Sequence, residues 1–98
     1  MPSTNDYLEY VLDLLMEVDD ISYKKMMGEY LLYSGGILIG GIYDNRFLLK
    51  KTPSLLKYNL KEEIPYTGAK PMYLLDIENK EEIKTIILDS FNDLSWIK

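Results

Sequence analysis

Acid–base chemistry in this chain of 98 residues would have to use carboxylates, lysine amines and tyrosine phenols, because the sequence contains no cysteine and no histidine. Their absence excludes disulfides, thiolate metal sites, cysteine nucleophiles and a Ser-His-Asp triad. The adjacent acids Glu62-Glu63 and Glu81-Glu82 do not form working pairs on a helix, since neighbouring residues there do not face each other. The most site-like segment is Tyr66-Thr67-Gly68-Ala69-Lys70, which joins a phenol, a hydroxyl and an amine near a glycine. It also fits a plain surface loop before a strand.

Two further motifs are candidates for ligand binding. Glu9, Asp13 and Glu17 recur every four residues and share one helix face. Stacked acids are typical of a solvated helix face, and that segment offers no other metal ligand. The pair Gly40-Gly41 lacks the strand-to-helix junction and the following Lys-Ser/Thr of a phosphate-binding loop, so it favours a bulge or close packing. We therefore expect a non-enzymatic protein without a metal or cofactor.

The charges divide the chain into three segments. The net charge is −5, yet the acids concentrate in residues 1–22 and 62–98, whereas residues 23–61 are basic. This basic centre contains Lys24, Lys25, Arg46, Lys50 and Lys51, with aromatic side chains at Tyr30, Tyr33, Tyr43 and Phe47. Cations with aromatic neighbours would suit an accessory protein that contacts nucleic acid. The negative net charge and the lack of a recognition-helix motif argue against tight DNA binding by the domain alone and favour acidic helices around a basic sheet edge.

The first half of the chain predicts a helix followed by three strands. Several N-cap residues at positions 3–6 precede an apolar stripe at helical spacing. The stripe consists of Leu8, Val11, Leu12, Leu15 and Val18. Runs rich in Ile, Leu, Tyr and Phe follow at residues 28–33, 37–43 and 46–51. Ser34-Gly35-Gly36 and Asp44-Asn45 separate these runs, and such residues tolerate the positive φ of hairpin turns, so we expect an antiparallel meander.

The second half predicts a short helix, one more strand and a closing helix. Thr52-Pro53 starts the short helix, and residues 62–70 form a loop before a strand at 72–77. Asn79 caps the last helix, whose apolar face holds Ile83, Ile86, Ile87, Phe91, Leu94, Trp96 and Ile97. Residues 1–98 are therefore expected to form a single α+β domain. Its antiparallel sheet would have about four strands, in the element order α-β-β-β-α-β-α.

A series of short motifs runs through nearly the whole chain. Lys24-Lys25-Met26-Met27-Gly28 leads into Tyr30-Leu31-Leu32-Tyr33, followed by Gly35-Gly36, Phe47-Leu48-Leu49-Lys50, Pro65-Tyr66 and Pro71-Met72-Tyr73. Their order and spacing resemble the TfoX/Sxy N-terminal domain family, in which a basic pair precedes Met-Phe-Gly-Gly and a Tyr-x-Leu-Tyr strand. Met27 and Glu29 stand where that family has Phe and the second Gly.

The resemblance implies a secretion-chaperone-like α+β fold, which is associated with protein partners rather than with catalysis. TfoX-type proteins are bacterial regulators of natural competence that act as co-activators with the cyclic-AMP receptor protein at promoters. They carry a second, helical domain, so this chain resembles a stand-alone homologue of their first domain. We expect a non-enzymatic protein-interaction or regulatory domain, with the transcription machinery as candidate partner. A nucleic-acid-contacting accessory protein and a small-molecule-binding domain are the alternatives.

Partner binding is expected at basic and aromatic residues of the centre and the following loop. These are Lys24, Lys25, Arg46, Lys50, Lys51, Tyr66 and Lys70. The strand at 37–43 is apolar on both faces, whereas a sheet with one wet face should alternate apolar and polar residues. We therefore expect a homodimer or a stable protein partner at the sheet. No apolar run is long enough for a membrane helix and no signal peptide is visible, so the cytoplasm is the expected compartment.

Overall fold

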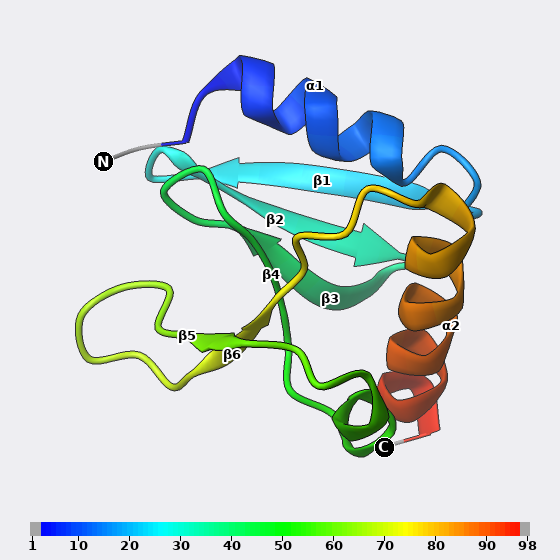
Figure 1. Ribbon diagram of the computed structural model, residues 1–98. Helices are drawn as coiled ribbons and strands as arrows, with labels where there is room; N and C mark the ends of the chain where they lie inside the picture. Colours follow the sequence, from blue (N-terminus) through cyan, green and yellow to red (C-terminus); the bar gives the residue numbers. More distant parts are fainter. Residues whose placement is uncertain (1–2, 97–98) are drawn as a thin grey trace.

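A helix from each end of the chain packs against one antiparallel sheet in the computed structural model, which describes residues 3–96 (Figure 1). Helix α1 spans Asn5–Leu14, and helix α2 spans Lys80–Trp96. The last apolar face is predicted to extend to Trp96 and Ile97. Ile97 and the side chain of Trp96 lie outside the described residues. None of the helices within residues 3–96 has both the length and the apolarity needed to cross a membrane.

Both helices begin at residues that the sequence indicates as caps. The Thr4 hydroxyl accepts a hydrogen bond from the Tyr7 amide at 3.1 Å and so satisfies one free N–H of the first turn. At α2, the Asn79 side-chain oxygen accepts one from the Glu82 amide at 2.9 Å. The prediction that Asn79 caps the last helix is confirmed.

Within residues 3–96, six strands form the sheet, in the spatial order β1-β2-β3-β4-β6-β5, and all neighbouring pairs are antiparallel. The strands are β1 (Ile21–Met26), β2 (Glu29–Ser34), β3 (Ile37–Ile42), β4 (Phe47–Leu49), β5 (Glu62–Glu63) and β6 (Met72–Leu74). The short helix η1 (Pro53–Tyr58) lies between β4 and β5 and is a 3₁₀ helix. Both predicted hairpin turns are confirmed, since Gly35, Gly36, Asp44 and Asn45 all have positive φ.

The sequence does not predict two of the strands, because their residues show no apolar pattern. Strand β1 is an edge strand whose residues 22–26 are all exposed, so nothing in it alternates between core and solvent. Strand β5 contains only Glu62–Glu63 and is defined by its pairing with β6. The predicted sheet of about four strands is therefore corrected to six. The element order is corrected to α-β-β-β-β-η-β-β-α.

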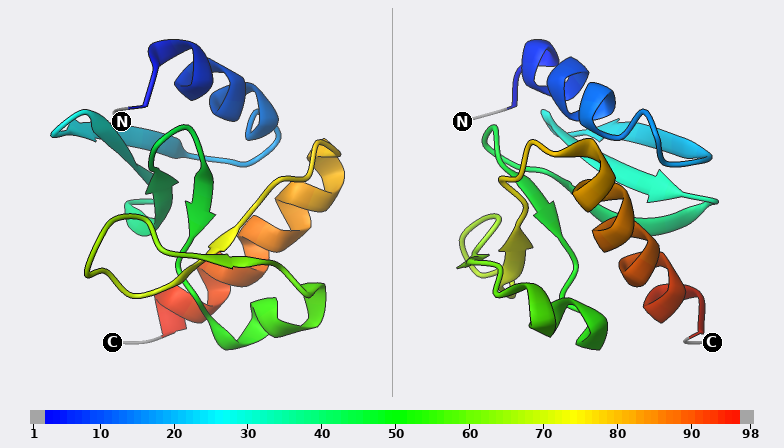
Figure 2. Two further views of the ribbon diagram at one scale, coloured as in Figure 1. Left: turned by 60° about the vertical axis from the view of Figure 1, so that its left-hand side comes forward. Right: turned by 45° about the vertical axis from the view of Figure 1, so that its right-hand side comes forward.

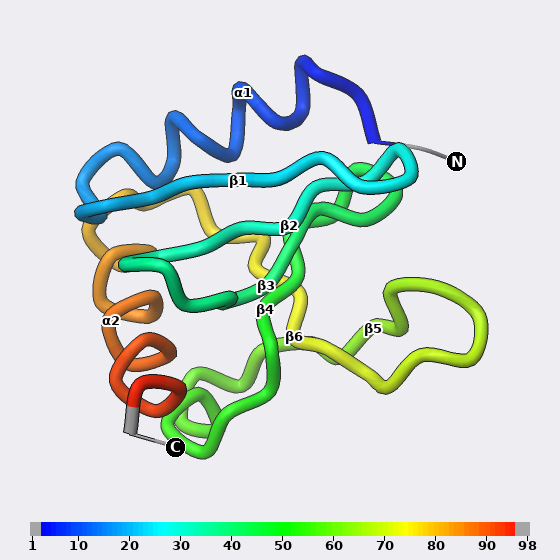
Figure 3. Tube along the Cα trace, turned by 180° about the vertical axis from the view of Figure 1, so that it is seen from behind, coloured from blue at the N-terminus to red at the C-terminus, as the bar shows by residue number. Residues whose placement is uncertain are grey.

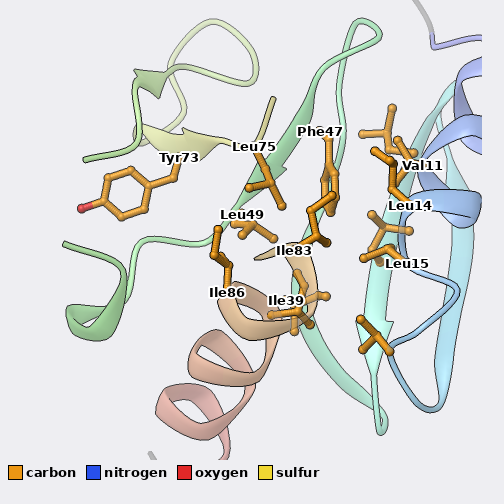
Figure 4. Packing of buried hydrophobic residues seen from close by; sticks show 14 of the residues in the cluster. Val11, Leu14, Leu15, Ile39, Phe47, Leu49, Tyr73, Leu75, Ile83 and Ile86 are labelled. Atoms are coloured by element: carbon orange, nitrogen blue, oxygen red, sulfur yellow. The ribbon is translucent and has the colours of Figure 1, made fainter. Parts of the chain in front are cut away.

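The apolar core lies between the two helices and one face of the sheet. Side chains of both helices meet those of β3 and β4 in a single cluster, among them Val11 and Leu15 of α1 and Ile83 and Ile86 of α2 (Figure 4). In the turned views, α1 lies along β1, whereas α2 runs from the level of β2 towards η1 (Figure 2). Both helices thus cover the same face.

The opposite face of the sheet, called the outer face from here on, has no helix across it in the described part of the chain (Figure 3). Side chains alternate along a strand, so Leu31 and Tyr33 of β2 face outwards, between the core residues Tyr30 and Leu32. Leu31 and Tyr33 are half-buried. Leu48 of β4 is fully buried but does not belong to the cluster under the helices. Leu48 is thus closed off from solvent, whereas Leu31 and Tyr33 leave a partly exposed apolar surface on the side that the helices do not cover.

Candidate functional site

Two tyrosines meet on the outer face, one after β3 and one in the loop that precedes β6. The ring centroids of Tyr43 and Tyr66 are 6.1 Å apart, and the rings are tilted by 50°. Tyr43 lies over Gly41, because a Cβ atom at Gly41 would stand 2.8 Å from the tyrosine ring. Burial raises the pKa of the Tyr43 phenol, and the neighbouring Tyr66 adds to the rise. The pair presents two adjacent amphipathic rings.

The glycine pair explains how the strand accommodates this ring. The β2–β3 register shifts between Leu32, which pairs with Gly40, and Tyr33, which pairs with Leu38, so a bulge lies directly before the glycine pair. A Cβ atom at Gly40 would lie 2.2 Å from the carbonyl oxygen of Leu48 on β4. The close neighbours are thus the backbone of β4 at Gly40, and at Gly41 the carbonyl oxygen of Tyr30 on β2 and the ring of Tyr43.

Arg46 holds the loop that carries Tyr66. Its guanidinium forms a salt bridge with Glu63 at 2.7 Å and donates hydrogen bonds to the carbonyl oxygens of Ile64 and Pro65, each at 3.2 Å. Its Nε donates to the Tyr43 carbonyl at 3.2 Å. The hydrogen bond from Arg46 also keeps the pKa of Glu63 below its usual value. Arg46 ties both tyrosine-bearing segments together, and its expected contact with a partner stays a prediction.

Three hollows surround Tyr66. The lysine hollow, of about 460 Å³, is lined by Tyr43, Lys50, Lys51, Pro65, Tyr66, Ala69, Lys70, Pro71 and Met72. The methionine hollow, also about 460 Å³, is lined by Met26, Met27, Glu29, Leu31, Tyr43 and Tyr66. A more polar hollow of about 610 Å³ is lined by Glu29, Asp44, Arg46 and residues 64–68. The tyrosine pair belongs to both of the first two hollows and stands between them.

The lysines on this face differ in how they are used. Lys51 forms a salt bridge with Glu62 at 3.1 Å, and its amine lies 5.6 Å from the ring centre of Tyr73. Lys50 and Lys70 line the lysine hollow, and neither forms an ion pair with another residue of the 3–96 range. Lys50 and Lys70 therefore place two positive charges beside an apolar surface, and neither charge is paired with a carboxylate of residues 3–96.

The two lysines of β1 lie on different faces. Lys24 stands opposite Leu31 in the β1–β2 pair and so shares the outer face, next to the methionine hollow. Lys25 stands opposite Tyr30, whose side chain belongs to the core side, and its amine lies 6.0 Å from the Tyr30 ring centre. The structure thus brings Lys50, Lys51, Tyr66 and Lys70 together, with Lys24 on the same face and Lys25 apart from them.

Sequence reasoning missed the methionine hollow. Met27 is 96% exposed and occupies the tight turn between β1 and β2 with a φ of 52°, a left-handed conformation that usually selects Asn, Asp or Gly. The visible signal was a methionine directly before Gly28 in a turn, but without β1 there was no hairpin in which to place it. Tyr43 is among the aromatic residues that the sequence indicates, but its place beside Met26 and Leu31 depends on the fold.

Glu29 lines the methionine hollow, and its carboxylate is hydrogen-bonded to other residues of the chain. Its carboxylate accepts hydrogen bonds from the amide and the hydroxyl of Ser3, at 3.0 and 2.6 Å, and from the Asp44 amide at 3.2 Å. These bonds tie the start of the chain to the β3–β4 turn. Glu29 is thus a structural acid.

Two further groups with a shifted pKa lie between η1 and α2. Tyr58 donates a hydrogen bond to Asp89, which raises the pKa of the phenol to about 12. Asp93 accepts hydrogen bonds from the amide and the hydroxyl of Ser54, both at 2.8 Å, which lowers the pKa of its carboxyl. Both contacts attach η1 to the last helix. Within the described range of the chain, no group of three or more His, Cys, Asp or Glu residues is placed to hold a metal ion.

No family model matches the chain. An uncharacterised 12.7 kDa protein from the region 5′ of trpE in Spirochaeta aurantia is 33% identical to it over 78 residues, which cover 78% of this chain and 68% of the Spirochaeta protein.

Proposed function

The chain belongs to the family of the Spirochaeta aurantia 12.7 kDa protein, and we propose that it is a non-enzymatic protein-interaction domain whose binding surface is the outer face of the sheet. The observation that carries this proposal is the combination on one face of an apolar hollow, a tyrosine pair and lysines without ion pairs. Soluble proteins rarely leave a contiguous apolar surface open unless something binds there. Tyrosine and methionine are also enriched in protein interfaces.

The resemblance to the TfoX N-terminal domain extends the proposal to regulation. Its α+β type is compatible with the observed fold, and several motif residues line the hollows of the outer face, namely Met26, Met27, Pro65, Tyr66, Pro71 and Met72. We propose a cytoplasmic regulatory domain with a partner in the transcription machinery.

Two occupants compete for the outer face, a second copy of the chain and a different protein. A two-fold dimer brings the same patch of both copies together. Where the two-fold axis passes through the lysine hollow, Lys50 and Lys70 of one copy lie near those of the other, and like charges repel across such an interface. The charge distribution therefore favours a different protein over the homodimer.

A nucleic-acid-contacting function is the second candidate, supported by the lysines that flank the tyrosine pair. The negative net charge of −5 and the small number of unpaired cations on this face weigh against it, because nucleic-acid affinity grows with the number of phosphate contacts.

Affinity capture with a matched pair of variants tests the proposed function. Tyr66 is 64% exposed on the outer face, and Leu56 is 69% exposed on η1. Truncation of either to alanine removes an exposed side chain and should leave the fold intact. Quantitative mass spectrometry of proteins captured from the native host should show a partner that Tyr66→Ala loses and Leu56→Ala retains. Equal capture by both variants would contradict the proposed surface.

A further inference from the structure

Met27 has a conformation and an exposure that the fold itself does not require. Its positive φ of 52° suits Asn or Gly better than a residue with a long side chain, and 96% of the residue is exposed. Strained backbone of this kind concentrates at functional sites. A methionine side chain is flexible and polarizable, and proteins use it on surfaces that adapt to a ligand. Its position at the lip of the methionine hollow makes it a contact for an incoming apolar group.

The charges beside this hollow indicate what else the ligand carries. Lys57 and Lys80, elsewhere on the described chain, have carboxylate partners at 3.2 and 3.3 Å, whereas Lys24, Lys25 and Lys84 have none among residues 3–96. Lys50 and Lys70 have none among residues 3–96, although the chain carries more acids than bases. Cations left unpaired on an acidic protein are complementary to a negative partner.

The two hollows share Tyr43 and Tyr66, so a ligand that fills both must pass over the tyrosine pair. A linear segment meets this requirement, with an apolar side chain on one side of the rings and carboxylates on the other. The neighbouring acid Glu29 does not repel the carboxylates of such a ligand in the lysine hollow. Glu29 lies in the methionine hollow, and its carboxylate is hydrogen-bonded to Ser3.

Building on the proposed function, we infer that the partner presents an acidic linear segment. Its large apolar side chain would enter the methionine hollow, and its carboxylates would face Lys50 and Lys70. A second copy fits less well, because its acidic helix α1 would dock head-to-tail on this groove and would not close into a dimer. A nucleic acid fits less well, because methionine and leucine side chains offer it no phosphate contact.

Selection of short random peptides on the full-length chain tests this inference. We expect the selected peptides to combine Asp or Glu with a large apolar residue. Synthesised with a fluorophore, such a peptide should bind with an affinity that falls as salt is raised. The double variant Lys50→Glu/Lys70→Glu should weaken binding by roughly tenfold.

Met27→Asn separates a binding role from a structural one. Asparagine tolerates the left-handed turn conformation, so the variant should unfold at the same or a higher temperature than the parent. Its affinity for the peptide should nevertheless fall roughly fivefold or more. Leu56→Asn, at an exposed apolar residue on η1, is the matched control and should bind the peptide unchanged.

The outcomes distinguish the inference from the proposed function. Neutral or basic peptides that lose affinity on Met27→Asn would overturn the acidic partner and keep the interaction surface. Failure to select any peptide, or peptides insensitive to both Met27→Asn and Tyr66→Ala, would contradict the surface itself. Tighter binding of a single-stranded oligothymidylate than of any selected peptide would assign the face to nucleic acid. A dimer mass in light scattering that Met27→Asn converts to a monomer would assign it to a second copy.

Discussion

Replacing Gly40 by alanine tests how the sheet accommodates the strand that leads to Tyr43. The new Cβ atom would stand 2.2 Å from the carbonyl oxygen of Leu48 and 2.9 Å from the Cα atom of Leu49. Both atoms belong to the backbone of β4, so no side-chain rotation relieves the clash and the two strands have to separate. Overpacking costs about 1–3 kcal/mol, and a lost hydrogen bond of the ladder adds about 1 kcal/mol.

We therefore expect Gly40→Ala to lower the free energy of unfolding by about 3 kcal/mol or more, a large share of the roughly 5–15 kcal/mol of a small domain. Equilibrium urea unfolding followed by circular dichroism measures this difference. Gly68→Ala is the control, because nothing lies within 4 Å of its Cβ position and only the φ of 89° is unfavourable. Its cost should be about 1–2 kcal/mol. A Gly40→Ala variant as stable as the parent would refute the packing interpretation and reopen a ligand-binding role for the glycine pair.

Three further predictions concern the loop, an alkaline transition and DNA. Arg46→Gln removes the salt bridge to Glu63, so hydrogen exchange should accelerate at residues 64–70 and stay unchanged in α2. Acceleration throughout the chain would contradict a local role of Arg46. The pKa of Tyr58 is raised from 10.0 to about 12, so its contribution to stability is complete below pH 10 and lost as the pH rises towards 12. Ultraviolet titration should show one phenol that ionises late, and Asp89→Asn should lower the pKa of that phenol. Duplex DNA should bind weakly at physiological salt in an anisotropy titration, and sub-micromolar affinity lost on Lys50→Glu would argue for the nucleic-acid function.

The elements that the sequence predicts are those with their own periodic or turn signal. The apolar stripe of α1, the cap Asn79 and the turn residues Asp44-Asn45 all act locally, and the structure has them where the sequence indicates. Strand β1 has no such signal, because its edge position leaves residues 22–26 exposed. Strand β5 exists only through its pairing with β6. Such elements depend on partners that are distant in sequence.

The candidate site shows the same limit. The basic and aromatic composition indicated Lys50, Lys51, Tyr66 and Lys70, and the structure gathers them around one hollow. That Arg46 is engaged with the loop follows only from the three-dimensional proximity of Glu63, 17 residues along the chain. The methionine hollow depends on the β1–β2 hairpin, so a sequence interpretation without β1 had no means of finding it.

Site-specific photocrosslinking tests the central claim, that the outer face binds a partner protein, most directly. Benzoylphenylalanine replaces Tyr66 in one variant and Leu56 in the other, since the two residues are 64% and 69% exposed but lie on different parts of the molecule. Irradiation of cells that naturally produce the protein should give a discrete adduct with one partner from position 66 and none from position 56. The same adducts from both positions, or no adduct from position 66, would contradict the claim.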